Sequence, residues 1–271
     1  MNNFTEKSIN EMSYTSFIAL INQTNVPPGA YSTLTKWRIN SGMNADSRVF
    51  EAACSTGFSL LNLVKNSNSQ GVGVDISAPS IEAAKKMASK MQLDNRTSFD
   101  YADATTYQAK EKFSHIVVGA ALGFFSNPSQ MMKNIFTMVD ECAYVLASPF
   151  YAFKEVPTKV IEESQRILGI TPTTQNYKEI MQVYHGFDVE YEDRLDSIPE
   201  TDDEIKHYCE STIARACQEL NISDNYSYMI LYERLKEIKQ ICNKLREYQK
   251  YSVLVLKYNR EHYPNRYVEI F

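Results

Sequence analysis

The sequence predicts an α/β fold with a doubly wound, mainly parallel sheet of seven strands, N-terminal helices and a helical insertion before the last strand. Three observations support this prediction. Short strand patterns alternate with helical patterns from Ser47 onward. The strands are β-branched and apolar at consecutive positions, which is typical of a sheet covered by helices on both faces. Two long helical patterns after Thr201 then precede a final apolar strand.

These patterns divide the chain into four segments. Residues 1–46 are predicted to be an N-terminal helical segment, and residues 47–200 the α/β core. Residues 201–250 are predicted to be a helical cap insertion, and residues 251–271 supply the final strand and a tail that complete the core.

In the N-terminal segment, Ile9 to Asn22 show the apolar spacing of one helix. The stretch NVPPGAYS ends that helix with two prolines and a glycine. Tyr31 to Ile39 then form a short helix that carries the only tryptophan, Trp37.

In the core, strands and helices follow one another in the order that right-handed parallel crossovers require. The predicted strands lie around Val49 and at GVGVDI, TSFDY, SHIVVGAAL, CAYVLAS and FDVEYEDRL, and the helices start at Phe58 and cover PSIEAAKKMASKM, Pro128–Val139, Val156–Leu168 and Asn176–Tyr184.

The insertion begins with a recognisable helix start. Thr201 and Glu204 have the spacing of a capping box and predict a helix toward Leu220. A second helix, about Tyr226 to Tyr248, has an apolar stripe, and the strand YSVLVLKY and the tail RYVEIF follow it. The position of this insertion before the last strand favours a cap over a ligand site. The apolar stripe of its second helix would equally suit core packing or a homodimer seam.

Composition excludes some functions. Acidic residues outnumber basic ones, 33 to 28, and the pI is about 5.5, which argues against a partner bound by neutralising nucleic-acid phosphates. No apolar run reaches the ~18 residues that a membrane helix needs. The polar start MNNFTEKSINEM does not resemble a signal peptide.

The cysteines indicate a reducing compartment. There are five, an odd number, and no two of them form a C-x-x-C pair. We therefore expect a cytoplasmic protein with neither disulfides nor a metal site. They are Cys54, Cys142, Cys209, Cys217 and Cys242.

One turn carries the first functional signal. Glu51 ends the first core strand, Gly57 opens the next helix, and Asp75 ends the second strand. In doubly wound folds an acid at the second strand end binds ribose hydroxyls. The dinucleotide fingerprint G-x-G-x-x-G is absent, and Glu51 would repel a pyrophosphate. The pattern therefore favours S-adenosylmethionine, which carries positive charge, over NAD or FAD.

From Ser47 to Ser148 the sequence resembles the class I S-adenosylmethionine-dependent methyltransferases. Their first motif, D/E-x-G-x-G-x-G, corresponds here to EAACSTG from Glu51 to Gly57, with Ala53 and Ser55 in place of two glycines. The stretches GVDIS, YADATTY and HIVVGAALGFF resemble the next three motifs, in the same order. The resemblance implies the Rossmann-like methyltransferase fold.

The resemblance also implies roles for single residues. Asp75 would bind the ribose, Asp103 would accept from the adenine amino group, and Ala104 would offer its backbone amide. The end of the fourth strand would pass close to the transferred methyl group. The implied cofactor-binding residues of the core are Glu51, Ala53, Cys54, Ser55, Gly57, Asp75, Ile76, Asp103, Ala104, Gly119 and Ala120.

In many relatives an N-terminal helix folds over the cofactor and contributes an aromatic side chain. Tyr14, Tyr31 and Trp37 are the candidates here, with NVPPGAYS as a hinge or lid. The alternative is that these aromatic residues only pack the helix onto the sheet. For Tyr31, packing is as well supported as contact with the cofactor. For Trp37, packing is favoured.

Topology sorts the candidate catalytic residues. Ligands of such folds bind at the carboxyl ends of the parallel strands. His115 and His185 precede strands, so they fall at the opposite edge. His262 follows the last strand, which the resemblance implies to run antiparallel, so it falls there too. His207 on the cap helix can reach the site, although a solvated helix histidine is the commoner outcome. Three other residues are equally good candidates for the catalytic role. They are Tyr208 and Glu210, beside His207, and Tyr151, after the fifth strand.

The acceptor is predicted to be a small molecule. The motif N/D-P-P-Y/F, which holds a flipped base in nucleic-acid amino methyltransferases, is replaced by Ala120-Ala121-Leu122-Gly123-Phe124. An apolar, tyrosine-bearing cap suits a partly aromatic acceptor in an enclosed pocket. The sequence thus predicts methyl transfer to a small molecule held under a helical cap. A non-catalytic S-adenosylmethionine-binding scaffold, and another reaction on a small molecule, stay open as alternatives.

Overall fold

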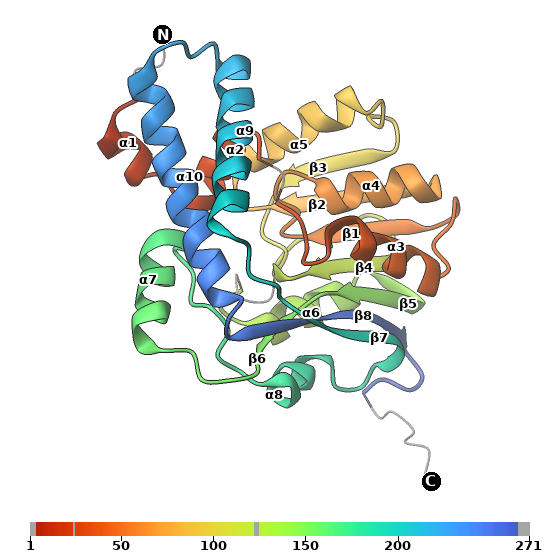
Figure 1. Cartoon of the computed structure of the whole chain (residues 1–271). Helices are drawn as coiled ribbons and strands as arrows, with labels where there is room; N and C mark the ends of the chain where they lie inside the picture. The colour runs from red at the N-terminus through yellow and green to blue at the C-terminus, as the bar shows by residue number, and fades with distance from the viewer. Residues whose placement is uncertain (1–3, 24, 122–124, 265–271) are drawn as a thin grey trace.

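The computed structural model describes residues 4–23, 25–121 and 125–264 (Figure 1). The stretch Leu122–Phe124 and the tail RYVEIF, both named above, lie outside these ranges. The strands are β1 (Arg48–Ala52), β2 (Gln70–Asp75), β3 (Thr97–Tyr101), β4 (Phe113–Gly119), β5 (Val139–Ala147), β6 (Phe150–Ala152), β7 (Asp188–Asp196) and β8 (Gln249–Asn259).

The helices alternate with the strands as the sequence predicts. They are α1 (Glu6–Asn10), α2 (Tyr14–Leu20), α3 (Ala30–Asn40), α4 (Phe58–Ser67), α5 (Ala78–Lys90), α6 (Pro128–Phe136), α7 (Thr158–Leu168), α8 (Tyr177–Met181), α9 (Asp202–Leu220) and α10 (Asn225–Leu245), with a short 3-10 helix at Gln182–Tyr184.

The strands form one mixed sheet in the order β3-β2-β1-β4-β5-β8-β6, with β7 also paired to β8. Strands β1 to β5 are parallel, whereas β8 runs antiparallel to β5, β6 and β7. The predicted fold class is confirmed. The short β6, directly after β5, adds an eighth strand to the seven that were predicted.

Several boundaries differ from the prediction, and at two helices the difference changes how an element is built. The N-terminal helix is two helices, because Ser13 accepts a hydrogen bond from the backbone N–H of Ser16 and so caps a second helix, α2. The helix predicted to end at Val139 ends at Phe136, and Val139 starts β5. The predicted capping box is confirmed, since Thr201 and Glu204 exchange side-chain to backbone bonds at the start of α9.

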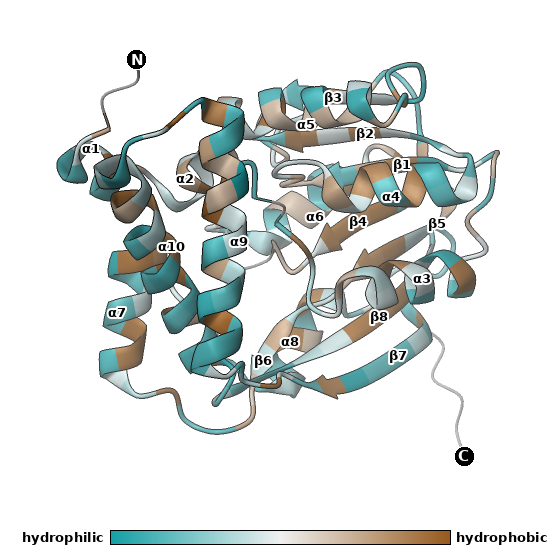
Figure 2. Ribbon diagram, turned by 45° about the horizontal axis from the view of Figure 1, so that its top comes forward, coloured by the Kyte–Doolittle hydropathy of each residue, from teal (hydrophilic) through white to brown (hydrophobic). Residues whose placement is uncertain are grey.

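Three apolar clusters hold the molecule together. Two of them cover the two faces of the sheet. The third joins α1, α2, α7, α9 and α10, which we call the helical layer, around residues such as Phe17, Ile213 and Leu235. In Figure 2 this layer stands beyond the arrowheads of the parallel strands, so it lies at their carboxyl ends. The N-terminal helices α1 and α2 thus share one core with the insertion, and α2 also packs against α5.

Candidate functional site

The turn from Glu51 to Gly57, called the elbow below, joins β1 to α4 at the carboxyl edge of the sheet. Three of its residues have left-handed backbone angles: Ala53 (φ 54°), Ser55 (φ 49°) and Gly57 (φ 81°). These are the three positions at which the resembled motif has glycine. The elbow therefore has the left-handed backbone that glycine favours, although Ala53 and Ser55 replace two of the glycines. Each of these two residues adopts it at a cost of roughly 1–2 kcal/mol.

Asp75 ties the elbow to the loop after β2. Its Oδ2 accepts a hydrogen bond from the backbone N–H of Ser55 and its Oδ1 accepts one from that of Ser77, both at 2.8 Å. The residue is 8% exposed, and burial raises the pKa of its carboxyl although the two N–H bonds act in the opposite direction. Each oxygen has a second lone pair with which it can accept a ribose hydroxyl.

Glu51 stabilises the start of α4. Its Oε2 accepts from the backbone N–H of Leu60 at 3.0 Å, and Ser59 also bonds its side chain. Gly57, the N-cap of α4, has no side chain to do this, so the acid of β1 serves as the cap. Glu51 is 6% exposed, and burial raises the pKa of its carboxyl to about 8.

Cys54 is enclosed within the elbow. A methyl group at Gly73 would lie 2.9 Å from its sulfur, so the small size of Gly73 makes room for it. Burial raises the pKa of the Cys54 thiol, which makes it a packing group rather than a reactive one.

The neighbouring ends of β2 and β3 form an exposed rim. Ile76 is 71% exposed, and Tyr101, paired with Asp75 in the sheet, is exposed as well. Asp103 follows, and its Oδ1 accepts from both the backbone N–H and the hydroxyl of Thr105, which orients the carboxylate. Ala104 is buried next to it. Sequence reasoning did not select Tyr101, although an aromatic residue at the end of a strand next to Asp75 was a usable signal.

β4 ends at Gly119, which is buried. Among the described residues, none outside its chain neighbours would lie within 4 Å of a methyl group built on Gly119, and its φ of 57° suits glycine. Its carbonyl accepts from the backbone N–H of Ser148 at 2.7 Å, which joins β4 to β5, and Ala120 is half-buried beside it.

The three N-terminal aromatic residues have different positions. The ring of Tyr31 meets the ring of Phe58, the first residue after the elbow, edge-on at 5.1 Å. Trp37 is fully buried and donates to the carbonyl of Ala147, so for Trp37 the packing alternative is confirmed. Tyr14 lies in the helical layer beside Cys242, where burial raises the pKa of its hydroxyl.

The four predicted catalytic candidates do not come together, and Glu210 is exposed on α9. His207 is exposed on α9, because Ile205, Cys209 and Ile213 turn inward on the opposite side of the helix. Tyr151 is buried in the core below the sheet edge and packs edge-on against Tyr177 at 5.4 Å.

Tyr208 lies next to a residue that contacts the elbow. The side chain of Gln23 acts on the Tyr208 hydroxyl to lower its pKa, and the carbonyl of Gln23 accepts from the hydroxyl of Thr56 in the elbow at 3.5 Å. The ammonium of Lys239 lies 4.3 Å from the centre of the Tyr208 ring, and burial raises the pKa of Tyr208 to about 12. No local pattern could have selected Gln23.

His115 is a core residue within β4 rather than before it. Its ring nitrogens lie 2.9 Å from the Ser114 hydroxyl and 3.3 Å from the carbonyl of Ser41. Burial lowers its pKa to about 4. His115 therefore stays neutral in the folded protein at ordinary pH.

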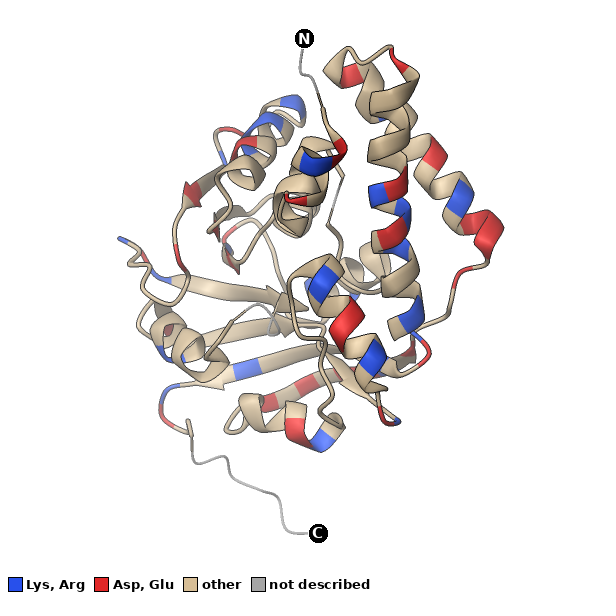
Figure 3. Ribbon diagram, turned by 90° about the vertical axis from the view of Figure 1, so that its left-hand side faces the viewer, with Lys and Arg blue, Asp and Glu red and all other residues tan. Residues whose placement is uncertain are grey.

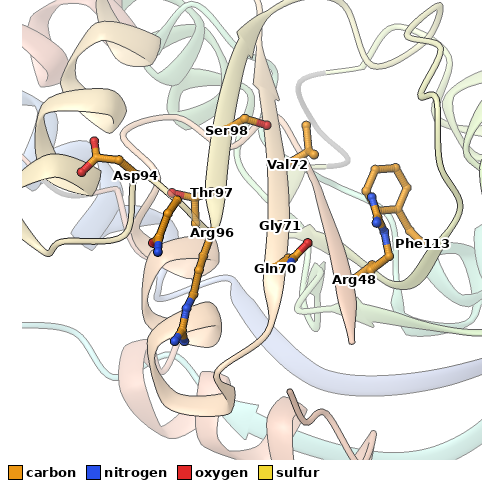
Figure 4. Close-up of a pocket in the computed structure, with 10 residues that line it drawn as sticks. Arg48, Gln70, Gly71, Val72, Asp94, Arg96, Thr97, Ser98 and Phe113 are labelled. Atoms are coloured by element: carbon orange, nitrogen blue, oxygen red, sulfur yellow. The ribbon is translucent and has the colours of Figure 1, made fainter. Parts of the chain in front are cut away.

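A cavity of about 270 Å³ lies at the opposite edge of the sheet, where β1, β2 and β3 begin (Figure 4). Its two arginines already have partners, Glu111 for Arg48 and Asn68 for Arg96. No elbow residue lines it. This cavity is therefore separate from the elbow.

Within the described ranges, no cluster of three His, Cys, Asp or Glu side chains is arranged to bind a metal ion. Nor does any helix there have the length and apolar character needed to span a bilayer. Figure 3 shows Lys and Arg positions mixed with Asp and Glu positions along the helices.

A family profile described as a methyltransferase domain matches residues 43–198, which is more than half of the chain. The structure of MccD protein is similar with a TM-score of 0.71 and 23% identity, over 86% of this chain and 99% of that one. No curated protein matches in sequence.

Two further solved structures have the same fold. An S-adenosylmethionine-dependent methyltransferase from Geobacter sulfurreducens, solved with S-adenosyl-L-homocysteine, has a TM-score of 0.66 and 18% identity over 89% of this chain and 96% of that one. Coclaurine N-methyltransferase, bound to N-methylheliamine and S-adenosylhomocysteine, has a TM-score of 0.65 and 12% identity over 93% and 85%.

Proposed function

This chain belongs to the methyltransferase domain family, and from that premise we propose that it transfers a methyl group from S-adenosylmethionine to a small-molecule acceptor bound beneath the helical layer. The observation that carries the proposal is the Asp75 carboxylate, bonded to two backbone N–H groups at the mouth of the elbow. A carboxylate oriented in this way presents two oxygens to two vicinal hydroxyls.

The remaining cofactor contacts follow the strand ends. Ile76 provides an apolar surface for the adenine, and Asp103 accepts a hydrogen bond from its amino group. The elbow backbone at Ala53 and Ser55 approaches the methionine part, and the end of β4 at Gly119 approaches the sulfonium end. Glu51 acts through α4, whose start it stabilises.

Methyl transfer from a sulfonium is an in-line displacement. The lone pair of the acceptor forms the new bond to carbon, and the electrons of the breaking carbon–sulfur bond return to sulfur. Because the donor is already activated, the protein contributes mainly orientation and exclusion of water. A general base is needed only when the acceptor must lose a proton, and Tyr208, whose pKa is raised to about 12, stays protonated and would instead donate a hydrogen bond to the acceptor.

Three findings support a small acceptor. Basic and acidic positions are mixed along the helices that Figure 3 shows, whereas nucleic-acid sites are usually basic patches. The helical layer lies beyond the carboxyl ends of the parallel strands (Figure 2), and its core contains apolar residues and several tyrosines. The coclaurine N-methyltransferase of similar fold was solved with a small ligand in its complex. Cytoplasmic location and a homodimer remain predictions of the sequence.

Calorimetry with S-adenosylhomocysteine tests the cofactor site. Asp75→Ala should weaken binding by roughly 1.5–3 kcal/mol, the usual contribution of hydrogen bonds to a charged group. Asp46→Ala, which removes an exposed aspartate from the loop before β1, is the matched control and should bind like the wild type. Unchanged affinity in a folded Asp75→Ala variant would remove Asp75 from the site.

Catalysis is tested separately from binding. Methyl-labelled S-adenosylmethionine is incubated with the protein and a small-molecule extract, and labelled products are separated from the donor. Transfer of label to a small compound supports the enzyme. Tight cofactor binding without any transferred label would favour the scaffold alternative.

A further inference from the structure

The turn Asn22–Gln23, directly after α2, is held by both the elbow and the cap helix. On the elbow side, the carbonyl of Gln23 accepts from the hydroxyl of Thr56 at 3.5 Å. On the cap side, Asn22 is hydrogen-bonded to Glu219 and Arg215 of α9, and the Gln23 side chain acts on the nearby hydroxyl of Tyr208. One short turn therefore contacts the two elements that the proposed function assigns to the cofactor and to the acceptor.

Two hydrogen bonds attach the turn to α9. The Asn22 side-chain amide donates to Glu219 Oε2 at 2.9 Å, and the Arg215 guanidinium donates to the carbonyl of Asn22 at 3.2 Å. Tyr208, Arg215 and Glu219 are seven and eleven residues apart, which places them on one face of a helix. A single stripe of α9, about 16 Å long at 1.5 Å per residue, thus holds the turn.

The turn is also firmly joined to α2. The backbone N–H of Asn22 donates to the carbonyl of Ala19 and that of Gln23 to the carbonyl of Ile18. At the elbow end, Thr56 is buried and stands next to Ser55, whose N–H binds Asp75. If α9 and the turn move together, Thr56 therefore transmits the movement to Ser55, whose backbone N–H is bonded to Asp75.

We propose that the Asn22–Gln23 turn is a positioning element that couples the cap to the cofactor site, so that cofactor affinity depends on α9 contacts that touch no cofactor. This inference rests on the proposed function. Glu219 and Arg215 are positioning residues in it, since they act through the turn. Because coupling between two binding sites is reciprocal, an acceptor that draws α9 closer also tightens cofactor binding.

The experiment uses the full chain and S-adenosylhomocysteine as the probe. Glu219→Ala removes the acceptor of the Asn22 bond, and we expect it to weaken binding roughly two- to tenfold, as one hydrogen bond implies. Glu219→Gln keeps a side-chain oxygen and should restore most of the affinity. Glu233→Ala, which removes an exposed, ion-paired glutamate from α10 of the same layer, is the control and should leave affinity unchanged.

A double-mutant cycle separates coupling from a loss of stability. If Asn22 and Glu219 act together, Asn22→Ala combined with Glu219→Ala should weaken binding no more than the stronger single change. Additive losses, or a Glu219→Ala variant that binds like Glu233→Ala, would overturn the coupling while leaving the proposed function intact. A wild-type chain that does not bind S-adenosylhomocysteine would overturn both.

Discussion

At the residue scale, the elbow shows that a glycine-type backbone can persist without its glycines. Ala53 has a φ of 54°, a region in which an L-residue costs roughly 1–2 kcal/mol. Ala53→Gly should therefore raise the free energy of unfolding by about 1 kcal/mol, measured in denaturant. Ala52→Gly, one residue earlier in β1, is the control and should lower it by roughly 0.5–1 kcal/mol. A loss of stability in both variants would contradict the strain argument.

His115 predicts a specific pH dependence of stability. Its pKa is lowered from 6.5 to about 4 in the folded state, so between these values the unfolded chain binds a proton that the folded chain does not. Stability from this residue is therefore fully present above pH 6.5 and is lost as pH falls toward 4, by ~3 kcal/mol in total. Unfolding of His115→Gln followed from pH 7 to 4 should lack this loss, and parallel curves for the two proteins would disprove it.

At the element scale, helix starts were the boundaries that local sequence determined best. In α9 the Thr201 hydroxyl accepts from the N–H of Glu204, and the Glu204 carboxylate accepts from that of Thr201. Thr201→Ala should lower the free energy of unfolding by about 1 kcal/mol. Thr158→Ala, at the start of α7 where no side-chain cap exists, should change it little. Equal effects of the two substitutions would show that the cap bond contributes nothing.

At the scale of the whole molecule, the helical layer has its own apolar core. Leu235 and Ile238 are almost completely buried within it. Leu235→Ala should cost ~2–5 kcal/mol. In this variant the backbone amides of α1, α2, α9 and α10 should exchange hydrogen faster than in the wild type, and those of β1, β2 and β4 should change less. The reason is that a contiguous core opens as one unit. Uniform acceleration over the whole chain would show that layer and sheet unfold as one.

Local patterns in the sequence determined the order of elements and the cofactor edge of the sheet. The alternation of strands and helices, the capping box at Thr201 and the acids at Glu51 and Asp75 depend on neighbours within one element or one crossover. Such local patterns can be interpreted from the sequence without knowledge of the fold. For this reason the βα order, the strand ends and the elbow could be predicted.

Only the tertiary structure decided how the helical segments combine and which side chains meet. It placed α1 and α2 in one core with the insertion, turned His207 to the surface and buried Tyr151 against Tyr177. It also joined Asn22 to Glu219, a pair separated by 197 residues. Contacts over such separations leave no periodic trace in the sequence, because they depend on how finished elements pack and not on the order of residues within them.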